Sequence, residues 1–298
     1  MRDSLEFRAL LPPVSSVDEL LHRLDELARD SIKSLPRGEI VVSYSGGIDS
    51  AILATLVAEE VGANTSLITV GVKQSRDVEN QRRDRSSLPY AKLQHKVVEV
   101  GQSRIEEAAL EVANMVNVST VSHLEDCLAF YLIAESLANL GQKGVLIVSA
   151  NGPDELFCGY DKFRRILDSE GYEAVNQESS RALQSAEMLQ AEVRKAVGAF
   201  GFQSGAPFLE EKFSKFCLEE VPAELKIIKG DDRLRKRLWR VYGGMIGLPR
   251  EIVLKPKQAM QYSMGIHKIV LKMLDKDASL KRWPNVKRAR TSLAETKR

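Results

Sequence analysis

The stretch VVSYSGGIDSAILATLVAEEVG, residues 41–62, joins a short apolar run to a helix-like pattern through Ser-Gly-Gly and an aspartate. In a parallel sheet, ligands bind beyond the carboxyl ends of the strands, where loops lead into helix N-termini. Gly46 and Gly47 lack Cβ atoms, so they can take positive φ and let phosphate oxygens approach the backbone. The N–H groups around residues 47–50 would point at such an anion, together with the positive end of the helix dipole. The stretch therefore predicts an anion-binding turn between a strand and a helix.

The aspartate at this seam points to a metal as well as an anion. Asp49 would repel a bare phosphate, but it fits the site if it holds a Mg²⁺ that clamps pyrophosphate oxygens. Ser45 adds a hydroxyl. The GK[ST] sequence of the P-loop in kinases and GTPases does not follow the glycines, so a different phosphate-binding loop is predicted.

The composition is that of an ordinary soluble globular protein. The 298 residues are 44% hydrophobic and 28% charged, and a net charge of +2 makes no case for a nucleic-acid or membrane partner. The start of the chain carries charges where a signal peptide needs an apolar core, and no apolar run approaches the roughly 20 residues of a membrane span. Three widely spaced cysteines without a CxxC pair indicate a reducing compartment. We expect a cytoplasmic protein.

Short apolar runs alternate with amphipathic stretches in the first half of the chain. The predicted strands are 40–44, 66–72, 96–100 and 144–149, and the predicted helices are 17–33, 50–61, 77–87, 104–116 and 124–140, the last ending at Gly141 as a C-cap. This alternation predicts an α/β fold, a doubly wound and mostly parallel sheet covered on both sides. Beyond about residue 154 helical periodicity dominates and no strand-like run recurs, so the C-terminal part is predicted to be helical. The last eighteen residues hold seven Lys/Arg against one Glu, which predicts a solvated basic tail.

The string SYSGGIDS, residues 43–50, resembles the signature of the ATP pyrophosphatase (PP-loop) family, which cleaves ATP between the α and β phosphates. That family includes asparagine, argininosuccinate, NAD and GMP synthetases and tRNA-modifying enzymes. The resemblance implies an adenine nucleotide alpha hydrolase-like fold, but this motif alone does not choose among the branches.

A second motif chooses the branch. VSANGPDELFCGYDKF, residues 148–163, resembles the SGEGADELFGGY stretch in the synthetase domain of asparagine synthetases and their β-lactam synthetase relatives. Gly152 allows a tight turn, and Pro153 suits an early helical position. Asp154 is then expected at the mouth of the same sheet as Asp49, where two carboxylates would make a better Mg²⁺–pyrophosphate clamp than either alone. Glu155 is explained equally well as an acid in a first helical turn.

Two further stretches resemble the same branch. FGFQSGAPFLEEKF, residues 200–213, keeps the family's Pro-Phe-Leu, which we interpret as packing. LPREIVLKPKQAMQYSMG, residues 248–265, resembles LP-x-x-I-x-x-RPKxxF and places Lys257 on the catalytic lysine, a compact charge suited to the α-phosphate. The resemblance covers about residues 20–275. The predicted organisation is a helical extension (1–38), an asparagine synthetase-like domain (39–275) and the basic tail (276–298).

The resemblance implies a concrete reaction. A substrate carboxylate, aspartate or similar, attacks the α-phosphorus of ATP, and Mg-pyrophosphate leaves; an amine or ammonia then attacks the acyl-adenylate to give an amide and AMP. Asp49, Asp154 and the 45–47 loop would hold the pyrophosphate, with Ser50 at the start of the helix and Lys257 as the electrostatic partner. By the family pattern the adenosine pocket would be lined by Tyr44, Val70, Ser149 and Ala150.

Two departures from the family pattern bear on the product. Asn151 stands where asparagine synthetases have a glutamate, and an amide cannot act as a general base near pH 7. The printed chain starts Met1-Arg2-Asp3 without the nucleophilic cysteine of a glutaminase, so we expect free ammonia, an amine, or ammonia from a separate glutaminase subunit. The alternatives are a PP-loop enzyme acting on tRNA, which only the basic tail favours, and a non-catalytic ATP-binding relative, which Asn151 suggests.

Overall fold

The computed structural model describes residues 7–12, 17–75, 78–79, 86–117, 120–231, 234–256 and 264–276. Most of the predicted helix 77–87, residue Lys257 and nearly all of the predicted tail lie outside these ranges. The division at residues 38 and 275 stays a prediction. No helix within the described part of the chain is long and apolar enough to cross a membrane.

Five parallel strands form one sheet in the order β3-β2-β1-β4-β5. The strands are β1 (Ile40–Ser43), β2 (Thr65–Gly71), β3 (Gln94–Glu99), β4 (Leu146–Val148) and β5 (Gln203–Gly205). The register aligns Ile40 of β1 with Thr65 of β2 and with Leu146 of β4. The strand order runs outward from β1 in one direction and from β4 in the other, so the crevice at their carboxyl ends is the topological switch point. The four predicted strands are confirmed to within a few residues.

The prediction that no strand follows residue 154 is wrong. β5 pairs with β4 along its whole length. Just after β4, the Ser149 N–H donates to the carbonyl of Gly205, the last residue of β5. Its sequence, Gln-Ser-Gly, contains no β-branched or aromatic residue, so local preference gives no strand signal. Pairing with the buried β4 decides its conformation.

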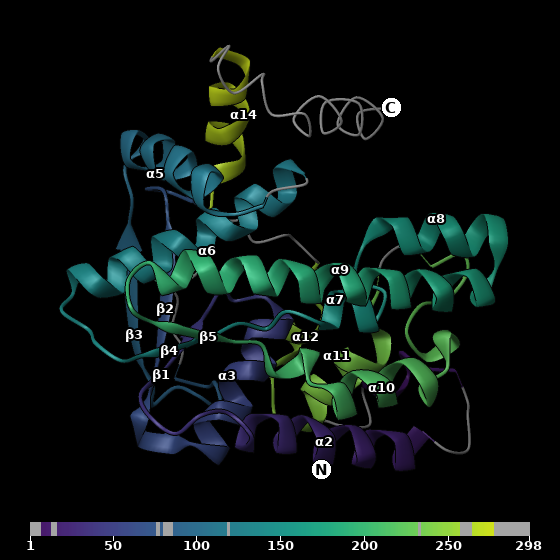
Figure 1. The fold of residues 1–298 in the computed structure, drawn as a ribbon. Helices are drawn as coiled ribbons and strands as arrows, with labels where there is room; N and C mark the ends of the chain where they lie inside the picture. The colour runs from purple at the N-terminus through teal and green to yellow at the C-terminus, as the bar shows by residue number, and fades with distance from the viewer. Residues whose placement is uncertain are drawn as a thin grey trace.

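Helices cover both faces of the sheet, as the apolar strands predict (Figure 1). One face packs against α2 (Val17–Lys33), α3 (Ile48–Glu60), α10 (Glu211–Glu219), α11 (Arg237–Met245) and α12 (Arg250–Val253). The other packs against α5 (Gln102–Met115), α6 (Val121–Asn139), α14 (Ile266–Lys276) and the C-terminal half of α9 (Tyr172–Gly198). Side chains of β1 alternate between these cores, with Ile40 and Val42 on the first and Val41 on the second. This alternation places Ser43 and Tyr44 on opposite faces just before the loop.

Local signals for helix ends agree with the structure. α6 begins after Thr120, whose hydroxyl accepts from the N–H of His123, and ends before Gly141, which takes φ 76°. The helix between Asp161 and Glu170, α8, is amphipathic and packs Phe163 and Leu167 against α9. The three cysteines are buried and free.

Candidate active site

The turn between β1 and α3 is organised by its own hydroxyls. The Ser45 N–H donates to Ser50 Oγ at 3.3 Å, and the two serine hydroxyls are 3.2 Å apart. Ser50 Oγ also donates to the carbonyl of Gly47 at 3.1 Å. These bonds close the turn while leaving the first N–H groups of α3 to a ligand. The 45–50 loop is therefore a closed turn at the carboxyl end of β1, as the predicted anion site requires.

The two glycines of the loop have different roles. Gly46 takes φ 69°, the left-handed conformation that a residue with a side chain adopts at a cost. Gly47 caps α3 with φ −83°, so the predicted positive φ is wrong for this residue. The Gly46 carbonyl accepts a hydrogen bond at 2.8 Å from Lys255 Nζ, a contact that joins the loop to the segment after α12.

The second turn, between β4 and α8, is shaped by tertiary contacts. Gly152 takes φ 116°, and a Cβ there would lie 2.7 Å from the carbonyl oxygen of Phe208. Pro153 opens the short helix α7 (Pro153–Leu156), with Asp154 in its first turn as predicted. Phe208 is fully buried against this turn, which confirms a packing role for the Pro-Phe-Leu stretch.

Asp49 and Asp154 meet at one buried cation. Lys236 Nζ lies 2.6 Å from Asp49 Oδ2 and 2.8 Å from Asp154 Oδ1, and the Lys236 side chain is 1% exposed. Lys236 precedes α11 in a left-handed conformation, φ 60°, which costs a residue with a Cβ about 1 kcal/mol or more. The two ion pairs offset that strain. The predicted pairing of the two carboxylates at one sheet edge agrees with this geometry.

Gly159 makes room for this ion-pair cluster. A Cβ on Gly159 would lie 1.9 Å from Asp154 Oδ1 and 2.3 Å from Lys236 Cε. The preceding residue, Cys158, takes φ 59° although the family motif has a glycine there. The chain therefore accepts a strained non-glycine residue at 158, while residue 159 has no space for a side chain unless Asp154 or Lys236 moves.

A cavity of about 160 Å³ opens beside the two turns. Seven predicted site residues line it: Ser45, Asp49, Ser50, Ser149, Ala150, Asn151 and Asp154. Its other walls come from α6 through Ser122, Asp126 and Phe130, and from α9 through Ala186 and Leu189. The Ser149 hydroxyl is buried there with no hydrogen-bond partner among the described residues. An orphaned buried hydroxyl in a cavity wall indicates a place for a ligand. A larger cavity, about 740 Å³, lies at the opposite edge of the sheet, at the starts of β1, β2 and β3.

Two predicted adenosine contacts do not reach the cavity with their side chains. Tyr44 lies on the α3 side, where its hydroxyl is 2.6 Å from that of Tyr90. Val70 packs into the core beneath α5 and α6. Neither lines the cavity, and their roles in binding adenosine stay predictions.

Two further acidic residues of the cavity lining, Glu155 and Asp126, lie close to Tyr160. The Tyr160 hydroxyl donates to Glu155 Oε1 at 2.5 Å. Burial, and next the charge of Asp154, raise the pKa of Glu155 to about 7. Burial raises the pKa of Tyr160 well above its usual value, and nearby Glu155, Asp154 and Asp126 add to that rise. Glu155 is therefore partly protonated near neutral pH, whereas an exposed glutamate would be ionised.

Asn151 is fixed by a chain of amides. Its Nδ2 donates to Gln190 Oε1 at 3.3 Å, and Gln190 Nε2 donates to Ser204 Oγ at 3.3 Å. Gln190 is 2% exposed on α9, and Ser204 belongs to β5. The unpredicted strand thus helps to orient the residue that departs from the family pattern.

A family model described as asparagine synthase matches residues 23–204, which is more than half of the chain. The chain belongs to the asparagine synthase family. This is an ATP-dependent ligase and amidotransferase family.

Relatives in the asparagine synthase family are distant but numerous. A protein of Methanocaldococcus jannaschii, provisionally named a glutamine-hydrolysing asparagine synthetase, is 25% identical over 88% of this chain and 52% of its own length. Glutamine-hydrolysing asparagine synthetases of Lotus japonicus and Mesocricetus auratus are each 27% identical, over 67% and 76% of this chain and 34% and 40% of theirs. The chain thus spans about half or less of the length of these relatives. An NH3-dependent NAD synthetase of Campylobacter jejuni matches 62% of this chain and 95% of its own at 17% identity, with a TM-score of 0.34, and adds nothing to the assignment.

The lysine that the asparagine synthase resemblance marks as catalytic, Lys257, lies outside the described residues. Both described flanks of that segment are held near the carboxyl edge of the sheet. Arg240 Nη1 donates to the Lys255 carbonyl at 3.1 Å, and Lys255 Nζ reaches Gly46. On the other flank, the Met264 carbonyl accepts from the N–H of Val72, just beyond β2.

Sequence reasoning missed Lys236, Trp239 and Lys255. Trp239 Nε1 donates to the second oxygen of Asp49, Oδ1, at 2.9 Å. The string RLRKRLWR, residues 233–240, reads as an exposed basic run, yet Lys236, Arg237 and Arg240 are buried. The only available signal was the tryptophan, because a large aromatic inside a basic run is unusual for a solvated surface.

Proposed function

We propose that this protein is an ATP-dependent amide-forming ligase of the asparagine-synthetase type, which adenylates a substrate carboxylate and releases pyrophosphate. The observation that carries this proposal is the Asp49–Lys236–Asp154 ion-pair cluster beside the 45–50 loop at the carboxyl edge of the sheet. This ion-pair cluster joins the motif at residues 43–50 to the motif at residues 148–163 beside one cavity. Membership of the asparagine synthase family supports the same reaction class.

The residues around the cavity have separate roles in adenylation. The N–H groups at the start of α3 and the Ser45 hydroxyl bind phosphate oxygens, and the helix dipole stabilises their negative charge. Lys236 keeps the two carboxylates within reach of one cation and supplies a positive charge beside the departing pyrophosphate. Lys257 would balance charge at the α-phosphate. Positioning and charge neutralisation together lower the barrier without a covalent enzyme intermediate.

The carboxylate pair fits Mg²⁺. Asp49 and Asp154 both line the cavity, beside the Lys236 ammonium that bridges them, and offer the hard oxygen ligands that Mg²⁺ takes, usually one or two from the protein and the rest from phosphates and water. Within the described residues there is no cluster of three or more acidic, histidine or cysteine side chains that could hold a metal alone. When bound, the metal neutralises the negative charge that builds on pyrophosphate.

Asn151 sets the chemistry of the second half-reaction. Held by Gln190, its side chain hydrogen-bonds the acyl group or the incoming amine and does not remove a proton. The amine arrives as ammonia, as an organic amine, or as ammonia from a separate glutaminase subunit. AMP formation with ammonium but not with glutamine, using the purified chain alone, tests that point; efficient use of glutamine by the purified chain would contradict it.

Substrate-dependent exchange of pyrophosphate into ATP tests the adenylation step. We expect exchange with at least one carboxylate among amino acids and small diacids, and loss of about hundredfold or more in Asp154→Asn because the clamp loses a charge. Asp168→Asn, an exposed carboxylate on α8, is the matched control and should retain the rate. ATP binding without exchange for any carboxylate would instead favour a non-catalytic nucleotide-binding relative.

A further inference from the structure

Trp239 is tied to the clamp by its only polar atom. Its side chain is fully buried, and its Nε1 donates to Asp49 Oδ1 at 2.9 Å, while Asp49 Oδ2 receives Lys236. A buried indole N–H needs an acceptor, and here the acceptor is a carboxylate of the proposed metal site. Residues 236 and 239 are three apart at the start of α11, so one helix turn provides a partner for each oxygen of Asp49.

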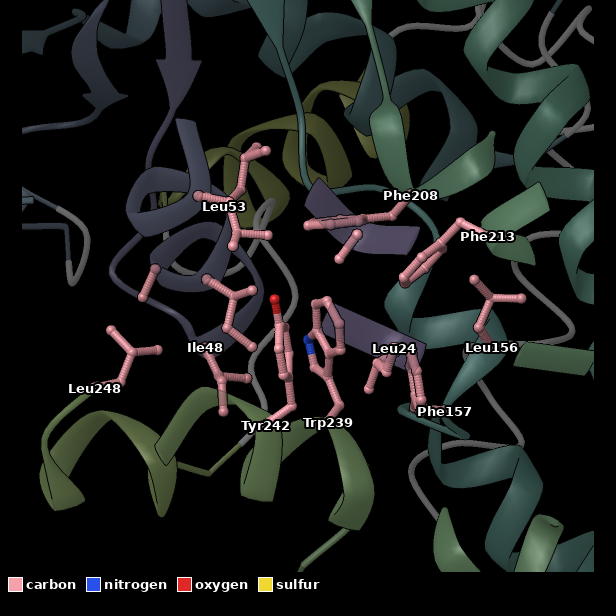
Figure 2. Packing of buried hydrophobic residues seen from close by; sticks show 14 of the residues in the cluster. Leu24, Ile48, Leu53, Leu156, Phe157, Phe208, Phe213, Trp239, Tyr242 and Leu248 are labelled. Atoms are coloured by element: carbon pink, nitrogen blue, oxygen red, sulfur yellow. The ribbon is translucent and has the colours of Figure 1, made fainter. Parts of the chain in front are cut away.

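The aromatic cluster around the indole fixes the direction of that N–H. The ring stacks on Phe157 with centroids 5.1 Å apart and planes 18° apart, and it meets Phe208 edge-on at 5.1 Å. Tyr242 and Phe213 pack at 5.3 and 6.1 Å. Figure 2 shows Trp239 among Tyr242, Phe157 and Phe208. Because close-packed rings surround the indole, it cannot turn without opening the core.

The indole also touches the other half of the clamp. Phe157 follows Asp154 by three residues and is the C-cap of α7, the short helix that carries Asp154. Trp239 therefore hydrogen-bonds to the first carboxylate-bearing turn and stacks on the second. A single rigid side chain sets how the two turns lie relative to each other.

We propose that Trp239 is a positioning residue that holds Asp49 in the orientation needed for Mg²⁺ opposite Asp154. This inference rests on the proposed function, because it assigns a role within the same site. Hydrogen-bond partners of ligating carboxylates orient them, and their loss typically weakens metal binding by roughly tenfold to a hundredfold. Packing alone would not require a nitrogen at this position.

A matched pair of variants separates positioning from packing. Trp239→Phe removes the N–H and keeps an aromatic ring; Tyr242→Phe removes a hydrogen bond of the same length, 2.9 Å to Asp25 Oδ1, from the same cluster. The measurement is calorimetric binding of ATP over a series of Mg²⁺ concentrations, with urea unfolding of each variant. We expect the Mg²⁺ concentration for half-maximal binding to rise roughly tenfold to a hundredfold in W239F and to be unchanged in Y242F. ATP binding in EDTA should be equal in both.

The intrinsic fluorescence of Trp239 gives a second measurement. The sequence has one other tryptophan, Trp283, outside the described residues, so Trp283→Phe leaves Trp239 as the only reporter. Adding Mg²⁺ to the ATP-bound W283F protein should shift its emission, because the carboxylate that accepts the indole N–H then shares its charge with the metal.

The outcomes distinguish the two proposals. If the wild-type protein binds ATP without any dependence on Mg²⁺, the proposed function fails. If binding depends on Mg²⁺ but W239F behaves as Y242F does, the positioning role is overturned while the proposed function stands. If W239F does not fold, the W283F emission decides, and an unchanged spectrum on adding Mg²⁺ overturns the positioning role.

Discussion

The two turns that carry Asp49 and Asp154 reach the same cation by different means. The 45–50 turn is closed by hydrogen bonds among its own residues, Ser45, Gly47 and Ser50. The 152–160 turn depends on distant partners, since Gly152 lies against Phe208 and Gly159 lies against Lys236. The backbone of the first turn is closed by its own residues and receives a side-chain contact from Lys255 at the Gly46 carbonyl, whereas the second turn packs directly against the C-terminal half of the chain. Substitutions in the second turn should therefore have larger effects.

The largest effect on activity is expected for Gly159→Ala. Its methyl group would displace Asp154 Oδ1 and Lys236 Cε, which are ends of flexible side chains, so the clamp opens while the backbone stays. We expect pyrophosphate exchange to fall about hundredfold or more with a stability loss within the usual overpacking range of about 1–3 kcal/mol. Gly198→Ala, at the end of α9 with open space around it, is the control and should change neither. Normal exchange in G159A would contradict a clamp built from this ion-pair cluster.

Gly152→Ala is expected to lower the free energy of unfolding more than it affects the cavity directly. Its Cβ would meet the backbone oxygen of Phe208 at 2.7 Å, and φ 116° is strained for any side chain. Because backbone cannot swing aside as a side chain can, we expect the free energy of unfolding to fall by about 3 kcal/mol or more. Urea denaturation measures this. A loss below about 1 kcal/mol would show that the 152–160 turn tolerates movement and would remove the contrast with G159A.

Glu155 makes the second turn sensitive to pH. Its pKa is raised from 4.5 to about 7 in the folded protein, chiefly by burial, so the folded state holds a proton that the unfolded state releases. The free energy of unfolding from this group therefore falls as pH rises from about 4.5 to 7 and is constant above that range. We expect Glu155→Gln to remove this fall, worth about 2–3 kcal/mol, relative to the wild type.

Urea unfolding at pH 5 and pH 8 provides that measurement, and Glu187→Gln, an exposed acid on α9, serves as the control. If E155Q and the wild type lose equal stability between the two pH values, Glu155 does not hold its proton in the folded state.

The smallest effect is expected in the first turn. Ser50→Ala removes the contacts of Ser50 Oγ with Ser45 and Gly47, and we expect a stability loss of about 1 kcal/mol and weaker ATP binding. Ser180→Ala, an exposed serine on α9 whose hydroxyl bonds to the helix backbone, is the control. A loss in S50A as large as in G152A would contradict the contrast between the two turns.

Local pattern predicted most of the sheet and one half of the site. The positions of β1, β2 and β4 follow from their apolar sequences, and the turn at Gly46 follows from the conformational freedom of glycine. Both signals act within a few residues of the chain. The position of β5 and the direction of the Tyr44 side chain were not predicted from local sequence. Pairing with β4 made a strand of Gln-Ser-Gly, and the pleat of β1 turned Tyr44 toward Tyr90 and away from the cavity.

The sequence by itself determined that two glycine-bearing turns, each with an aspartate, follow buried parallel strands, because turn geometry and strand hydrophobicity are local properties. Only the tertiary structure decided which cation joins those aspartates. Lys236 and Trp239 lie more than eighty residues beyond Asp154 along the chain, within a basic run whose one sign of burial is the tryptophan itself. They reach the site because α11 packs its aromatic face into the core, where a buried ammonium and an indole N–H each require an acceptor.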